Sequence, residues 1–109
     1  MNSRDKGKRG ELEWASKCRE HGFDARRGQQ YSGNPDAPDV VTDLPVHFEV
    51  KRVERLNIVD AMDKARQESG DLPPVVAHRK NHCDWLVTMR ADDWFEVMRE
   101  YMYSKELPW

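Results

Sequence analysis

Acidic and basic side chains near the middle of the chain have the types and spacing of a hydrolytic metal site. Glu49 and Lys51 alternate with apolar neighbours across residues 46–53, so in a strand both would point to the same face. Asp39 precedes Glu49 by ten residues, across a turn near Leu44. In a hairpin centred on that turn, Asp39 lies opposite Glu49, with Cβ atoms about 4.5–5.5 Å apart. Two facing carboxylates repel each other, and a divalent cation with oxygen ligands would compensate.

Two further side chains could complete this site. Glu11 falls on the apolar face of a helix expected over residues 10–20, because Trp14, Ala15 and Cys18 follow it at helical spacing. Lys51 lies about 6.5–7 Å beyond Glu49 along the strand, close enough to orient a water molecule or a phosphate oxygen. Simpler explanations stay open. The helix dipole favours an acid in the first turn, and Glu49 with Lys51 could be an exposed surface pair.

Charge is unevenly distributed along the chain. The net charge of −2 and the pI near 6.1 argue against binding of polyanions over the whole surface. Residues 1–30 hold eight basic and five acidic residues, residues 31–50 hold four acids and no base, and residues 51–66 hold five bases and three acids. An acidic segment between basic flanks is typical of a cation held beside phosphates, although scattered surface charge would give the same counts.

The elements that would position these residues follow from hydrophobic period and turn signals. We expect an α/β domain in the order αβββαββα, with a mixed sheet flanked by helices. The expected helices cover residues 10–20, 57–70 and 92–103, and the expected strands cover 23–26, 39–41, 46–53, 74–78 and 85–89. Residues 39–41 and 46–53 are predicted to form the hairpin, and residues 28–38 a loop rich in Gly, Pro, Asn and Ser.

Length and composition exclude several classes. A chain of 109 residues fits one domain, and 35% charged residues with a mean hydropathy of −0.96 are too polar for a membrane protein. No secretory signal is recognised, so we expect a cytoplasmic protein whose cysteines, Cys18 and Cys83, are reduced. The pair His78 and His82 with Cys83 is a weak zinc pattern that lacks a fourth ligand.

Several short motifs resemble those of a nuclease superfamily. They are Gly10-Glu11, Gly22-Phe23 followed by Arg26 and Arg27, Ser32-Gly33, Pro38-Asp39 and Glu49-Val50-Lys51. Together they resemble the PD-(D/E)XK nuclease superfamily and, within it, the small archaeal-type and phage Holliday junction resolvases. The resemblance covers roughly residues 7–90 and implies a restriction-endonuclease-like core.

The resemblance also implies roles for individual residues. Mg²⁺, for which Mn²⁺ could substitute, would be held by Glu11, Asp39, Glu49 and the carbonyl of Val50. Lys51 would position the attacking water, with Ser32 and Gln67 as further catalytic residues. The implied DNA contacts are Lys8, Arg9, Arg26, Arg27, Ser32 and Arg52.

The favoured interpretation is a single nuclease domain over residues 1–109 that acts as a Mg²⁺-dependent, structure-specific resolvase of four-way DNA junctions. Host cells would be bacterial, archaeal or phage-infected. Residues 1–7 are expected to be flexible. A homodimer is expected, with the aromatic helix 92–103 and the tail 100–109 as contact, although these residues could instead close the domain's own core. Alternatives are a nuclease of the same fold acting on flaps, nicks or linear duplex, and a non-catalytic DNA-binding module.

Overall fold

A computed structural model describes residues 3–28 and 38–106, with side chains over 6–28 and 38–105. Its elements in chain order are α1 (Ser3–Glu20), β1 (Ala25–Arg27), β2 (Val40–Thr42), β3 (His47–Arg52), α2 (Ile58–Glu68), β4 (Pro74–Arg79), β5 (Leu86–Met89) and α3 (Ala91–Glu106). The predicted α/β class and the order αβββαββα are therefore confirmed.

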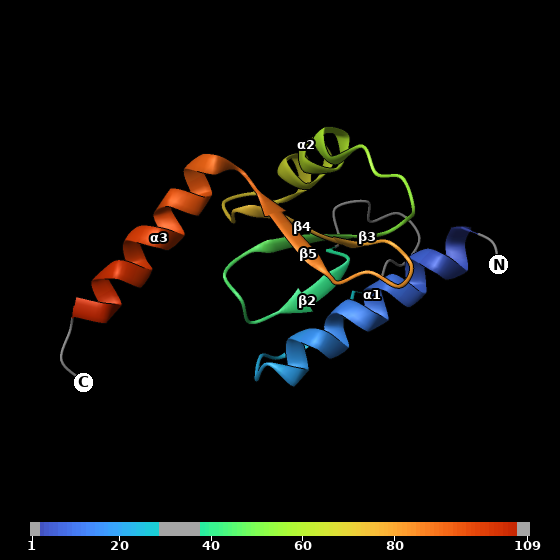
Figure 1. Ribbon diagram of the computed structural model, residues 1–109, viewed down its shortest axis with the longest axis horizontal. Helices are drawn as coiled ribbons and strands as arrows, with labels where there is room; N and C mark the ends of the chain where they lie inside the picture. Colours follow the sequence, from blue (N-terminus) through green and yellow to red (C-terminus); the bar gives the residue numbers. More distant parts are fainter. Residues whose placement is uncertain (1–2, 29–37, 107–109) are drawn as a thin grey trace.

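In the described part of the chain, the strands form a mixed sheet of three strands and a sheet of two. β3 pairs in parallel with β4, and β4 pairs antiparallel with β5, so β3 is an edge strand. β1 pairs antiparallel with β2. The three-stranded sheet lies between α1 and α2 (Figure 1).

The predicted hairpin between residues 39–41 and 46–53 is wrong. β2 pairs with β1, and β3 reaches its partner β4 through the α2 crossover. The turn itself explains this, because the Leu44 N–H donates to Thr42 Oγ1 at 3.2 Å and the Asp43 N–H donates to the Asp24 carbonyl at 3.2 Å. The Asp43–Asp24 bond ties the turn to the residue before β1, and the Leu44–Thr42 bond is internal to the turn. Residues 47–50 are all buried, as expected of a strand in parallel pairing that is covered on both faces.

α1 is longer than predicted and ends as predicted. It begins at Ser3, seven residues before the expected start. At its end, Gly22 has a φ of 89°. The Gly22 N–H donates to the Arg19 carbonyl at 3.0 Å and the Phe23 N–H to the Cys18 carbonyl at 3.1 Å. This is a Schellman motif, which needs a residue without a Cβ at the left-handed position.

α1 packs closely on one face of the sheet. The Trp14 ring meets Phe48 edge-on at 5.3 Å and Trp85 at 5.1 Å between centroids. Gly10 is buried, and a Cβ there would lie 2.9 Å from the Cβ of Arg52. The absence of a side chain at position 10 therefore lets α1 approach β3 at the turn that carries Glu11.

α2 covers the opposite face. Asn57 caps it, because its side chain accepts from the Asp60 N–H at 3.1 Å. Ala61 and Ala65 are buried against Val76 of β4, so their small side chains bring the helix close to the sheet. Side chains alternate along β3, which places Phe48 and Val50 towards α1 and Glu49 towards α2.

α3 extends away from the rest of the molecule (Figure 1). With α3 included, the molecule measures 50 × 27 × 26 Å. Its exposed apolar side chains are Trp94, Phe95, Val97, Tyr101, Met102 and Tyr103. Within residues 91–105, the helix therefore does not close the core of its own domain. The described helices include none that is long and apolar enough to cross a membrane.

Candidate active site

Asp39 and Glu49 come together at the free edge of β3. The Val50 N–H points away from β4 and donates to Asp39 Oδ2 at 2.9 Å. Asp39 is 8% exposed and Glu49 is 1% exposed. The two carboxylates are therefore neighbours, as predicted, but through a side-chain bond to the edge of β3 and not through a hairpin register.

Glu11 reaches the same region from α1. Its carboxylate is buried together with Trp14, Ala15 and Cys18, as the helical spacing predicted. Arg27 of β1 lies beside it, with Nε 3.6 Å from Glu11 Oε2. Three elements, α1, β3 and the segment before β2, thus supply one acidic side chain each.

The three carboxylates act on each other electrostatically. The pKa of Glu11 is raised by burial first, and then by the charges of Asp39 and Glu49, against the lowering effect of Arg27. The pKa of Asp39 is raised by burial and by the charge of Glu49, while the Val50 N–H opposes this. Burial and the neighbouring carboxylates thus raise the pKa of both acids despite the basic side chains nearby.

Two lysines contact Glu49 from different elements. Lys51 Nζ lies 3.5 Å from Glu49 Oε1, which confirms that the two side chains share a face of β3. Lys64 Nζ, from α2, donates to the same oxygen at 3.0 Å. Burial by itself would lower the pKa of Lys64, but the hydrogen bond to Glu49 and the charges of Glu49 and Asp39 raise it.

Sequence reasoning missed Lys64. Ala61 and Ala65 form the buried stripe of α2, and position 64 is three residues after the first of them, on the border of that stripe. A basic residue at that border was the available signal.

A second pair on the same face was also missed: His47 Nε2 lies 3.8 Å from Glu68 Oε2. Burial and the charge of Glu49 raise the pKa of Glu68.

The donor set suits a hard divalent cation. Glu11 Oε2 and Glu49 Oε2 are buried without a hydrogen-bond partner, and carboxylate oxygens are the ligands that Mg²⁺ prefers. Over residues 6–28 and 38–105, whose side chains the structure describes, no three His, Cys, Asp or Glu side chains already stand in a metal-binding arrangement. The Glu11 and Glu49 carboxylates are instead turned to basic neighbours, Arg27, Lys51 and Lys64.

The predicted DNA-contacting residues divide into two groups. Lys8, Arg9 and Arg26 are exposed, and Arg27 lies next to Glu11. Arg52 lies on the α1 side of β3, where its Nε is 3.3 Å from Glu13 Oε2 and its side chain is only 14% exposed. The structure therefore does not bring Arg52 to the Lys51 face.

Of the two remaining predicted catalytic residues, the structure describes only Gln67, and it does not bring Gln67 to the site. Gln67 is exposed on α2, and Lys64, one turn earlier, makes the contact with Glu49. Ser32 lies outside the described residues.

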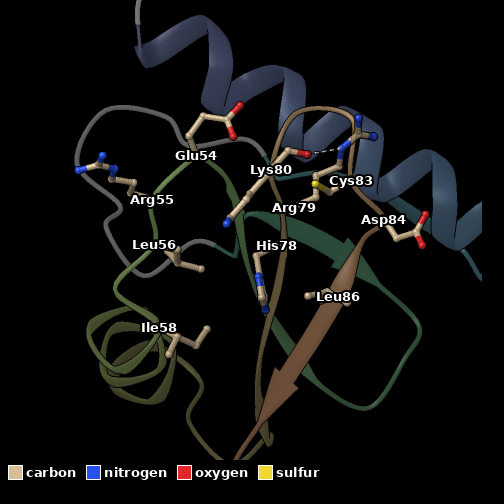
Figure 2. A pocket seen from close by; sticks show the side chains of 10 residues that line it. All are labelled: Glu54, Arg55, Leu56, Ile58, His78, Arg79, Lys80, Cys83, Asp84 and Leu86. Carbon is tan, nitrogen blue, oxygen red and sulfur yellow. Dashed lines mark hydrogen bonds between the residues drawn. The ribbon is translucent and has the colours of Figure 1, made fainter.

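Two hollows follow the Lys51 face of the sheet. The first, of about 290 Å³, has both Lys51 and Lys64 in its wall. The second, of about 580 Å³, shares Arg55 and Leu56 with the first and continues across β4 and β5. Figure 2 shows Leu56, Ile58 and His78 facing its middle, with Arg55 pointing away.

The weak zinc pattern is not assembled. His78 lies in the second hollow, and its Nε2 is 2.8 Å from Thr88 Oγ1. Burial lowers the pKa of His78. Around His78 and Cys83, as elsewhere among the described residues, no three metal-binding side chains gather.

Comparison with known proteins supports the fold. No protein-family profile and no curated protein sequence matches the chain. Among solved structures, it is similar to Hjc, a Holliday junction resolvase of the archaeal hyperthermophile Archaeoglobus fulgidus. The TM-score is 0.53 and the sequence identity 24%, over 77% of this chain and 72% of the other. The chain thus has a resolvase-like fold.

Proposed function

We propose that this protein is a Mg²⁺-dependent DNA endonuclease of the PD-(D/E)XK type. One observation carries the proposal: Glu11, Asp39 and Glu49, from three different segments, are buried at the open edge of β3 beside Lys51. Burial and the nearby carboxylates raise the pKa of Glu11 and Asp39, and buried acids of this kind are costly without a cation to compensate. The similarity to a resolvase structure supports the same reading.

The chain's own residues have distinct parts in the reaction. Glu11, Asp39 and Glu49 would hold the ion, together with the carbonyl of Val50. That carbonyl points to the same strand edge as the Val50 N–H, which bonds Asp39. Bound Mg²⁺ would neutralise charge on the scissile phosphodiester and lower the pKa of water. Lys51 would orient the attacking water, so that it enters in line with the departing 3′ oxygen.

The proposed substrate is a four-way DNA junction. The structurally similar archaeal protein is named as a Holliday junction resolvase, and exposed basic residues Lys8, Arg9 and Arg26 are available for phosphates. A junction presents two equivalent strands, so two copies related by two-fold symmetry would each cut one. We therefore propose that a homodimer is the active form.

A non-catalytic DNA-binding module explains the site less well. Phosphate is repelled by carboxylates, so a protein that only binds DNA gains nothing from three converging acids. Lys51 and Lys64 would serve such a protein better without Glu49 beside them, since Glu49 neutralises their charge towards phosphate.

A substrate panel tests the proposal. The wild type is incubated with labelled four-way junction, flap, nicked and linear duplex DNA in Mg²⁺, Mn²⁺ and EDTA. We expect symmetric paired cuts in the junction with either ion, slower cutting of the other DNAs, and none in EDTA. Equal cutting of all four DNAs would support the nuclease proposal but contradict a preference for junctions. Binding without cutting in every buffer would support the non-catalytic module.

A further inference from the structure

Lys64 is left without a role by the mechanism above. Glu49 Oε1 accepts a hydrogen bond from Lys64 Nζ at 3.0 Å and also lies 3.5 Å from Lys51 Nζ. One buried carboxylate therefore faces two ammonium groups. Lys51 accounts for the water-orienting role, so the second lysine calls for a different explanation.

Lys64 stands between the buried carboxylate and the open surface. Its side chain is 51% exposed, whereas that of Glu49 is 1% exposed. Lys51 and Lys64 also line the same hollow of about 290 Å³. A lysine is a compact charge on a flexible stem of four carbons, so its ammonium can change partner while the helix backbone stays in place.

A cation bound by Glu49 would compete with Lys64. Ammonium and metal ion are both positive, and both favour the same carboxylate over water. Glu49 Oε2 is the oxygen without a hydrogen-bond partner and Lys64 bonds Oε1, so an ion on Glu49 would repel the Lys64 ammonium and weaken its bond at the mouth of the hollow. A phosphate oxygen at that position would give the Lys64 ammonium a new negatively charged partner in place of Glu49. Lysine commonly binds phosphate in proteins.

We propose that Lys64 is a phosphate-binding residue that exchanges partners: it bonds Glu49 in the metal-free protein and a DNA phosphate once a divalent cation occupies Glu49. This inference rests on the proposed function and adds a substrate contact to it. It differs from a constant phosphate contact, because the contribution of Lys64 to DNA binding would then depend on the metal.

The test is the salt dependence of DNA binding by wild type and Lys64→Met, measured in Ca²⁺ and in EDTA. In Ca²⁺, removal of one phosphate contact is expected to reduce the slope of log K against log salt by about 0.9 and to weaken binding roughly tenfold near 0.1 M salt. In EDTA the two proteins should bind within about twofold, because Glu49 already neutralises Lys64. Arg66→Met is the control, since it removes the same charge from an exposed position of α2.

A second readout needs no DNA. Calorimetric titration with Mn²⁺ should show tighter binding by Lys64→Met than by wild type, since the competing ammonium is gone, and no change for Arg66→Met. Lys64→Arg keeps the charge and should restore the wild-type salt slope. Circular dichroism and thermal melting show that each variant is folded.

The outcomes separate this inference from the proposed function. In one outcome, wild type binds and cuts DNA, and Lys64→Met loses DNA affinity equally in Ca²⁺ and in EDTA, or in neither. This outcome overturns the exchange of partners and leaves the proposed function in place. Unchanged Mn²⁺ affinity in Lys64→Met overturns it as well. A wild type that neither binds nor cuts DNA overturns both proposals.

Discussion

Burial of Glu11 and Asp39 is costly for the metal-free protein, whereas the buried Glu49 has two ammonium partners. Each is less than 10% exposed, and mutual repulsion adds to the cost of removing charge from water. Such groups are retained where a ligand or an ion compensates for them, so the residues that lower stability are the ones expected to carry the activity.

The first prediction concerns stability and pH. The pKa of Asp39 is raised above its usual 3.8, so the folded protein holds the carboxyl proton more tightly than the unfolded chain does. The free energy of unfolding therefore falls as the pH rises from the unfolded-state pKa through the folded-state pKa of this carboxyl. Asp39→Asn keeps an acceptor for the Val50 N–H but removes the charge. In EDTA, its Tm should exceed that of wild type at pH 7 by a few degrees.

The difference in Tm should shrink as the pH is lowered, because the wild-type carboxyl then takes up a proton and loses its charge. Added Mg²⁺ should stabilise wild type more than Asp39→Asn. If Asp39→Asn has a lower Tm than wild type at pH 7 without metal, the charge of Asp39 does not destabilise the metal-free protein.

The second prediction concerns Lys51. If its ammonium orients water and does not hold the ion, Lys51→Ala should lower the single-turnover cleavage rate by about 10²–10⁴-fold. Calorimetry should show Mg²⁺ affinity equal to or higher than that of wild type. Lost Mg²⁺ affinity in this variant would assign Lys51 a structural part in the ion site instead.

At the scale of elements, the site depends on how closely α1 approaches β3. The order of elements and the buried face of α1 were predictable from apolar spacing, because Trp14 and Cys18 share a stripe with Glu11. The pairing of β3 was not, since alternating residues look the same in parallel and antiparallel strands. Lys64 was not predicted because its contact with Glu49 depends on the α2 crossover.

The third prediction uses two glycines of α1. A Cβ at position 10 would meet the Cβ of Arg52 at 2.9 Å, whereas nothing lies within 4 Å of one at position 7. Gly10→Ala should push the Glu11 turn away from β3 and reduce cleavage by at least tenfold. Gly7→Ala should keep full activity and gain up to about 1 kcal/mol from helix propensity.

Cleavage rates and urea unfolding of the two variants check this prediction. Equal activity in Gly10→Ala and wild type would mean that the close approach of α1 is not needed to position Glu11.

At the scale of the whole molecule, α3 is an exposed apolar element. Trp94 is 47% exposed, Phe95 52% and Met102 58%, and the helix projects from the body of the protein (Figure 1). Apolar side chains gathered on one element are typical of a protein contact surface. A second copy of the chain fits the proposed function, because one site cannot cut both strands of a junction.

The fourth prediction is therefore a dimer held through α3. Light scattering should report about twice the 12.8 kDa of one chain. Replacement of both Trp94 and Met102 by Ser should shift the mass towards one chain and convert paired cuts into single nicks. Val59→Ser removes an exposed apolar side chain from α2 and should leave the mass unchanged.

A wild type that remains monomeric at concentrations where it makes paired cuts would overturn the dimer. It would leave the catalytic assignment in place.

The most direct measurement of the central claim compares wild type with Glu49→Gln in single-turnover cleavage of a four-way junction in Mg²⁺. Gln keeps the shape of Glu49 and an acceptor for Lys64 but removes the charge that would hold the ion. We expect cleavage by wild type that EDTA abolishes. Glu49→Gln should lose at least about 10²-fold in rate, while a gel shift shows that it still binds the junction. Undiminished cleavage by Glu49→Gln would contradict a metal-dependent site at Glu49.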